Sequence, residues 1–324
     1  SDYRCLLSDE KFSRNMEVYT IGLPSASPFK FNPFYILPGV HPQTHIDYLK
    51  SIFLASFSFY GPMPYIVDSC LCEIYKNKGW DLVSGHHPYF FDLFGNFMHE
   101  RYEEFEHYFC FPSLQDLFDE IDKFMRQSEY VGELESNIKA AILTRVKNLC
   151  QGSKGQTFNT FHFPDFKKLL STPIIFELQY LADDEDKSFF IGLILAYLSE
   201  FRQCEHENEK CSVNSSRKLK HILVLEEALR LLKNVSLTRE NEMLGNPSGK
   251  AVEFFCNALS EMRGYGEGLI IVEQIPSKLA PDVVKNTSTK IVHRIPSADD
   301  QKLLANSMGL INNHEYWLNM LNTG

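Results

Sequence analysis

The sequence predicts an α/β protein, with a mostly parallel β-sheet covered by helices and a mainly helical insertion. After Cys150, short apolar segments alternate with amphipathic ones. This alternation is typical of a parallel sheet buried on both faces. Between His41 and Cys150, apolar residues recur every three or four positions, which indicates helices. We therefore expect a parallel sheet interrupted at about residues 41–150.

Residues 1–40 form the expected amino-terminal part of the core, and residues 41–150 form the insertion. The amino-terminal part is irregular and rich in proline, with one expected strand at Glu17–Gly22. Four helices are expected in the insertion, with the sequences HIDYLKSIFLASFSFY, YIVDSCLCEIYKNKGW, SLQDLFDEIDKFMRQ and ELESNIKAAILTRVKNL. Ser113 and Asp116 form a capping start for the third of these helices.

Residues 151–324 carry the larger part of the expected sheet. A strand at Thr172–Leu181 and a helix at Asp186–Arg202 precede a polar, acidic stretch, CEHENEKCSVNSSRK, which predicts an exposed loop. The expected strands that follow are KHILVLEE, GLIIVEQ and TKIVHRI. The expected helical segments are ALRLLKN, GKAVEFFCNALSEMRGYG, PSKLAPDVVKN and ADDQKLLANSMG.

Composition limits the class of protein. The formal net charge of −10 argues against a uniformly basic nucleic-acid-binding surface. The longest apolar run, Phe189–Leu198, is about half of the roughly 20 residues that span a bilayer, so it predicts a buried helix. Eight irregularly spaced cysteines indicate free thiols in a reducing cytoplasm. The beginning, SDYRCLL, has no methionine and no signal peptide, which suggests a segment of a longer chain.

Polar residues that end the expected strands are the candidates for chemistry. Glu226 and Glu227 end an apolar strand, where parallel sheets bind ligands. In phosphoryl transfer, one such acid holds hydrated magnesium and its neighbour activates the attacking water. Gln274 ends the strand GLIIVEQ, and an amide at the end of a neighbouring strand can sense a γ-phosphate. Arg263 and Arg294 are candidate arginine fingers. The alternative for all five is structural: first-turn acids favoured by the helix dipole, a polar strand terminus and solvated arginines.

Residues 218–310 resemble the HerA/FtsK superfamily of RecA-like P-loop ATPases, most closely the HerA-type DNA translocases. The resemblance lies in KHILVLEEALRLL, FCNALSEMRGYGEGLIIVEQIPSKLAPDVVKNTSTKIVHRI and SADDQKLLANSMGL. LTRVKNLCQGSKGQTFN and the following TPIIFELQYLADDEDKSFFIGLILAYLSEFR are similar to the segment before Walker B, and SPFKFNPF carries the resemblance in the amino-terminal part. The resemblance implies that Glu226 and Glu227 are the Walker B acids and that Gln274 is the sensor. Arg263 would be the arginine that acts on the neighbouring subunit, with Arg294 as a second such contact.

Two departures from this family matter. Leu229 stands where the family usually carries a histidine. The sequence also contains no G-x-x-x-x-G-K-[ST] loop. GNPSGKA at Gly245–Ala251 has the wrong spacing and an alanine in place of the magnesium-binding hydroxyl, and GSKGQT at Gly152–Thr157 lacks the Gly-Lys-Ser/Thr ending. The resemblance places the P-loop upstream of a segment like DYRCLL. We therefore expect this chain alone to bind ATP weakly and to hydrolyse it negligibly.

The function that the resemblance implies is a ring-forming motor that translocates double-stranded DNA and uses ATP and Mg²⁺. Glu227 would be the general base, and Glu226 would hold magnesium through water. The expected partners are further copies in a homo-hexamer, double-stranded DNA, and a nuclease or another defence or repair protein. Two alternatives stay open. One is a conjugative or type IV secretion ATPase that moves protein or protein–DNA, and the other is a non-catalytic scaffold.

Two further clusters have simpler explanations. Cys204, His206 and Cys211 are possible zinc ligands, but their irregular spacing favours an exposed acidic loop. Glu104-x-x-His107 matches half of a carboxylate-bridged metal motif, and without a second copy a solvated helix face is favoured.

Overall fold

The computed structural model describes residues 2–23, 27–92, 94–127, 133–210, 218–235, 247–310 and 317–321. Contacts divide the chain into two compact units, residues 1–204 and 205–324, which are described separately. The domain boundaries expected at residues 40 and 150 remain predictions, because compactness does not identify an insertion. No helix in the described ranges has the length and apolarity needed to cross a membrane.

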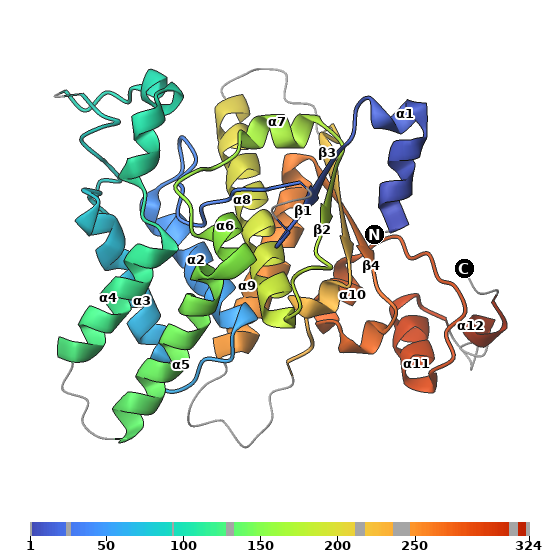
Figure 1. Cartoon of the computed structure of the whole chain (residues 1–324). Coiled ribbons are helices and arrows are strands. Elements are labelled where there is room, and N and C mark those ends of the chain that lie inside the picture. The colour runs from blue at the N-terminus through green and yellow to red at the C-terminus, as the bar shows by residue number, and fades with distance from the viewer. Residues whose placement is uncertain are drawn as a thin grey trace. The chain divides into compact units, whose positions relative to one another are not determined.

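The first unit combines a helical layer with one small sheet (Figure 1). Strand β1 pairs in parallel with β2, so that Glu17 lies opposite Ile174 and Thr20 opposite Glu177. Figure 1 shows α3, α4 and α5 side by side, and these neighbouring helices contact each other. The elements are η1 Asp2–Ser8, α1 Glu10–Ser13, β1 Glu17–Thr20, α2 Pro42–Ser56, α3 Met63–Asn77, η2 His99–Glu103, η3 Phe105–Cys110, α4 Leu114–Gln127, α5 Glu133–Cys150, α6 Gly152–Phe158, α7 Phe166–Ser171, β2 Ile174–Glu177 and α8 Asp184–Lys210, which runs into the second unit. All four helices expected between residues 41 and 150 are confirmed.

Aromatic side chains form much of the core of the first unit. The rings of Tyr35 and Phe163 stack with centroids 4.4 Å apart, and Phe31 meets Tyr197 edge-on at 5.1 Å. The Tyr197 hydroxyl donates a hydrogen bond to the carbonyl oxygen of Tyr35 at 2.7 Å. Because Tyr197 belongs to α8, these contacts anchor the irregular segment around residues 31–35 to that helix.

Two buried carboxylates hold distant parts of the first unit together. At the carboxyl end of β2, Glu177 accepts hydrogen bonds from Arg4 Nη2 at 2.7 Å and Arg4 Nε at 3.2 Å. The hydroxyl of Thr20 donates to the same carboxylate at 2.9 Å. Farther along, Glu200 on α8 lies 2.8 Å from Nδ1 of His45 on α2, and both side chains are fully buried. Burial away from competing water strengthens such contacts but makes the loss of one partner costly.

The second unit contains the other parallel pair of strands. Strands β3 and β4 are in register from His221 opposite Glu267 to Glu226 opposite Val272. The elements are β3 His221–Glu226, η4 Ala228–Arg230, α9 Pro247–Met262, η6 Arg263–Tyr265, β4 Glu267–Val272, η7 Pro276–Lys278, α10 Pro281–Asn286, α11 Ala298–Ser307 and α12 Trp317–Met320. The strands expected around Leu223 and Ile270 are therefore confirmed.

The expected sheet is only partly present. The α/β class and the parallel pairing agree with the prediction, but the described residues form two separate two-stranded sheets. One face of the second sheet is also open, since the side chains of Ile222, Val224, Ile270 and Val272 are 46 to 52% exposed. Helices over both faces, as parallel sheets usually have, are thus not seen for this sheet among the described residues.

Three local predictions are wrong, each for a physical reason. Thr289–Ile295 is not a strand: Ile295 donates its N–H to the carbonyl of Leu318 at 3.0 Å instead of joining a ladder among the described residues. ALRLLKN forms a single 3₁₀ turn. Leu232 still donates its N–H to the carbonyl of Ala228, but its own carbonyl accepts from Ala280 at 2.8 Å and Asn234 donates to the carbonyl of Lys278, so the chain leaves the helical path after Leu232.

The third correction concerns the acidic loop expected from Cys204, of which residues 211–217 lie outside the described part. Cys204–Lys210 instead continues α8. Lys220 binds Glu205 at 3.0 Å and Glu209 at 2.7 Å. These two glutamates are four residues apart, so one lysine pairs with two carboxylates on the same face of the helix.

Candidate functional site

The acid pair lies at the carboxyl end of β3. Glu226 is the last residue of the strand, and the N–H of Glu227 donates to the carbonyl of Val272 at 3.1 Å. Both glutamates are exposed. Among the described residues, Glu227 alone has a positive φ without being a glycine, with φ 52° and ψ 43°. That conformation costs a residue with a side chain about 1–2 kcal/mol, and such strain is concentrated at functional sites.

Gln274 lies at the same edge of this sheet as the acids. Strand β4 ends at Val272, directly opposite Glu226, and Gln274 follows two residues later with an exposed side chain. The parallel pairing therefore brings the three predicted residues Glu226, Glu227 and Gln274 to one edge. Their catalytic roles stay predictions.

Glu273 links the two strand ends, and the sequence analysis did not identify it. Its Oε2 atom accepts the N–H of Leu229 at 3.2 Å. Its Oε1 atom accepts the N–H of Gln274 at 2.8 Å and that of Ile275 at 3.4 Å. In the sequence, the available signal was that Glu273 directly precedes Gln274, the candidate sensor. No local pattern shows that the Glu273 carboxylate binds the turn after β3.

Arg230 is the second residue that sequence reasoning missed. Its Nε atom donates to Oε2 of Glu227 at 2.7 Å, and its Nη2 atom donates to the same oxygen. The Arg230 side chain is 18% exposed and that of Glu227 58%. The three-residue separation within one turn was the available clue. In this structure, the carboxylate of Glu227, the candidate general base, is thus paired with a guanidinium from its own turn.

One of the two candidate arginine fingers, Arg263, lies away from the acids. Arg263 begins η6, ahead of the amino end of β4. The six residues of β4 separate it from the carboxyl edge by about 20 Å, at roughly 3.3 Å per residue. Arg294 lies in the segment that precedes α11, and its side chain is exposed. The structure does not bring Arg263 to Glu226 and Glu227 of the same chain.

The donor set at this edge suits a hydrated magnesium ion bound together with a nucleotide. Within the described ranges, no three His, Cys, Asp or Glu side chains come together to hold a metal ion. Magnesium rarely needs such a cage, because it keeps several waters and takes one or two carboxylates plus substrate phosphates. Glu226 and Glu227 provide exposed carboxylates of this kind. The chain supplies no Gly-Lys-Ser/Thr loop for the phosphates, so it fits the magnesium part of the cofactor alone.

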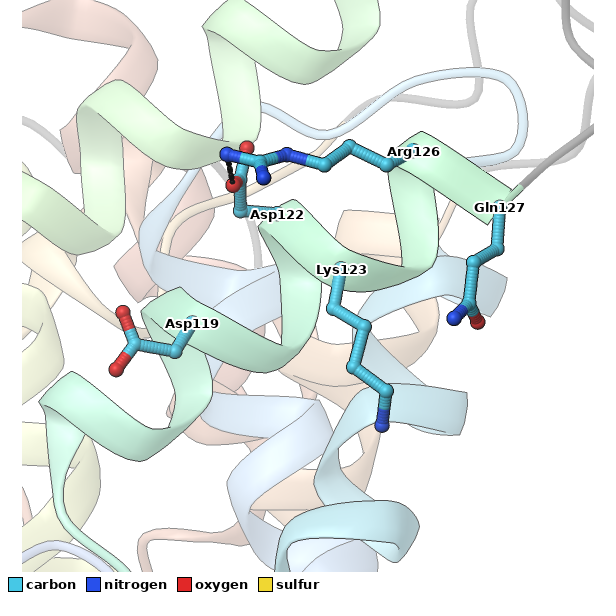
Figure 2. A pocket seen from close by; sticks show the side chains of 5 residues that line it. All are labelled: Asp119, Asp122, Lys123, Arg126 and Gln127. Carbon is cyan, nitrogen blue, oxygen red and sulfur yellow. Dashed lines mark ion pairs between the residues drawn. The ribbon is translucent and has the colours of Figure 1, made fainter.

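A surface hollow in the first unit does not coincide with these residues. It measures about 250 Å³ and is lined by Asp119, Asp122, Lys123, Arg126 and Gln127. Figure 2 shows that all five side chains extend from one helix, α4, with Arg126 directed at Asp122. Asp122 pairs with Arg126 at 2.5 Å and with Lys139 at 2.7 Å. Asp122 therefore has two cationic partners, Lys123 pairs with Glu120 outside the hollow, and nothing in the hollow indicates chemistry.

The two possible metal clusters also gain no support. Cys211 lies outside the described residues, and Cys204 and His206 belong to α8. The prediction of a solvated helix face is wrong for His107, which is buried and contacts the carbonyl oxygen of Glu104 through Nδ1. Burial lowers the pKa of His107. The Glu104 carboxylate is bound by Tyr89 and Arg101, and these hydrogen bonds lower its pKa.

Comparison with known proteins finds a likeness among solved structures. No protein-family model matches the chain, and no curated protein does. Among solved structures, VirB4 of Thermoanaerobacter pseudethanolicus matches with a TM-score of 0.62 and 14% sequence identity. The match covers 100% of this chain and 75% of that VirB4 chain. At this identity the likeness shows a shared fold, which agrees with the α/β P-loop type expected from the sequence.

Proposed function

We propose that this chain is part of an ATP-hydrolysing motor related to VirB4, the ATPase type of type IV secretion, which moves protein or protein–DNA substrates. The observation that carries the proposal is the length of the VirB4 likeness, which includes the helical part at residues 41–150 as well as the strands. The acids at the end of β3 and the amide at the end of β4 support an ATPase independently, because phosphoryl transfer uses such groups at one strand edge.

In the proposed reaction, the residues of this chain bind, orient and move protons. Glu226 would hold a magnesium ion through water, and that ion would supply positive charge beside the phosphates. Glu227 accepts the proton of the attacking water. For this step Arg230 must leave the Glu227 carboxylate that it binds here. Gln274 contacts the γ-phosphate or its product.

Assembly completes the proposed site. Arg263 lies at the opposite end of β4 from the acids of its own chain, so it serves a neighbouring copy. Arg294 is a second candidate for that contact. A closed ring of identical subunits presents every arginine to a neighbour's site, and we propose a homo-hexamer.

A DNA translocase of the HerA type is the second candidate. The resemblance of residues 218–310 to those translocases favours it, and double-stranded DNA would then be the substrate. A nuclease or another defence or repair protein would be the expected partner.

The test is ATP turnover by the full-length gene product that contains this chain, with and without double-stranded DNA. The matched variant is Glu227→Gln, which keeps the shape of the side chain but cannot take the proton. Loss of a general base lowers turnover by about 10²–10⁴-fold. Turnover that DNA leaves unchanged and that Glu227→Gln abolishes supports the secretion-type motor.

Other outcomes decide between the remaining candidates. DNA-stimulated turnover that depends on Glu227 favours the translocase. If the wild-type protein shows no turnover, the motor function is rejected and the non-catalytic scaffold remains as the hypothesis.

A further inference from the structure

Glu273 binds backbone groups of two different turns at the candidate site. One is the turn after β3, in which Leu229 lies two residues after Glu227. The other is the turn after β4, which carries Gln274. The two carboxylate oxygens are divided between them: Oε2 accepts from Leu229, and Oε1 accepts from Gln274 and Ile275. A half-buried carboxylate that accepts several N–H bonds is a strong anchor, because charge-assisted hydrogen bonds are about twice as strong as neutral ones.

The turn that Glu273 holds is a strained one. Glu227 has left-handed backbone angles, which persist only where surrounding contacts impose them. Two side-chain contacts act on this turn, since Arg230 binds the Glu227 carboxylate from within it and Glu273, directly after β4, binds its backbone. The Glu273 carboxylate also serves as an N-terminal cap of η4, because Leu229 is the second residue of that helix.

We infer that Glu273 is a positioning residue that couples Gln274 to Glu227, so that a shift of the β4 turn is passed to the turn of the general base. This inference rests on the proposed ATPase function. When Gln274 follows the γ-phosphate, its backbone N–H moves with it, and the shared carboxylate then moves or releases the N–H of Leu229. Glu273 itself touches no reactant and acts through the backbone of the two turns.

The test compares Glu273→Ala, Glu273→Gln and a control, Glu253→Ala, in the full-length gene product. Glu253 is exposed on α9, so its removal takes away the same charge without touching either turn. We expect Glu273→Ala to lower kcat for ATP by about 10²-fold, the scale of a misplacement by about 1 Å, with the KM nearly unchanged. Glu273→Gln should recover part of this loss, because its single amide oxygen accepts from one turn but not from both.

A second readout separates positioning from loss of stability. Amide hydrogen exchange at Leu229 should quicken in Glu273→Ala and stay near the wild-type rate in Glu253→Ala. Suppose that Glu227→Gln inactivates the enzyme but the kcat of Glu273→Ala lies within twofold of wild type. The coupling is then rejected, while the ATPase function is retained. A wild type without turnover overturns both. An equal fall of kcat in the Ala and Gln variants with Leu229 exchange unchanged also overturns the coupling.

Discussion

Removing Arg4 should destabilise the first unit strongly, because it leaves a buried carboxylate without its cation. The side chain of Glu177 is 1% exposed, and the guanidinium of Arg4 meets both of its oxygens. Breaking one partner of a buried pair costs about 3–5 kcal/mol. The Arg4 side chain is 44% exposed, so water can replace part of its contact, and we expect about 3 kcal/mol.

Thermal unfolding of the Arg4→Met variant measures this loss. For a unit of about 200 residues, each kcal/mol lowers Tm by roughly 2–4 °C, which gives a fall of about 6–12 °C. Arg14→Met is the matched control. Arg14 pairs with Glu10 at 3.7 Å with both side chains largely exposed, so Tm should change by less than about 2 °C.

A double substitution separates the lost pair from lost packing. Replacing both Arg4 and Glu177 by methionine removes the unpaired charge, and apolar replacement of a whole buried pair is often neutral. We expect the double variant to regain most of the Tm lost by Arg4→Met. If the Tm of Arg4→Met lies within 2 °C of that of Arg14→Met, the argument that the buried Glu177 carboxylate needs Arg4 for stability is refuted.

Three more predictions concern the remaining parts of the chain. Gly266→Ala should lower the free energy of unfolding by about 1–3 kcal/mol, seen as a lower urea midpoint, since φ is +91° and a new β-carbon would lie 2.6 Å from the carbonyl oxygen of Lys218. Gly264→Ala meets no atom within 4 Å and should leave the midpoint unchanged, so equal midpoints in the two variants would contradict the strain argument. Iodoacetamide at pH 8 should modify exposed Cys5 and spare Cys70, because burial raises the pKa of Cys70 to about 12 and the thiolate is the reactive form. Mass-spectrometric detection of modified Cys70 in the folded chain would disprove this. Calorimetric titration of this chain with MgATP should show weak binding, and submicromolar affinity would contradict the need for a separate Gly-Lys-Ser/Thr loop.

Local patterns in the sequence were enough for much of the helical structure and for the position of the candidate site. The three- and four-residue spacing of apolar side chains predicted helices such as Leu114–Gln127, where Leu117 and Ile121 are fully buried. The strand ahead of Glu226 and Glu227 followed from a short apolar run. A parallel pairing with the strand before Gln274 then placed these polar residues at one edge. Such signals are local, because they depend on residues a few positions apart.

The tertiary structure decided what depends on partners distant in the chain. Thr289–Ile295 has the composition of a strand but makes no ladder among the described residues, since a strand needs another strand's edge for its hydrogen bonds. The link from Glu273 to Leu229 spans 44 residues, and that from Arg4 to Glu177 spans 173. No spacing rule in the sequence reaches so far. The sequence by itself therefore determined most of the helices, the strands that pair in the two sheets, and the polar residues that end β3 and follow β4. Only the fold determined which groups bind the same carboxylate, as at Glu273 and Glu177. Hydrogen bonds form between atoms about 3 Å apart in space, and such atoms can belong to residues far apart in the chain.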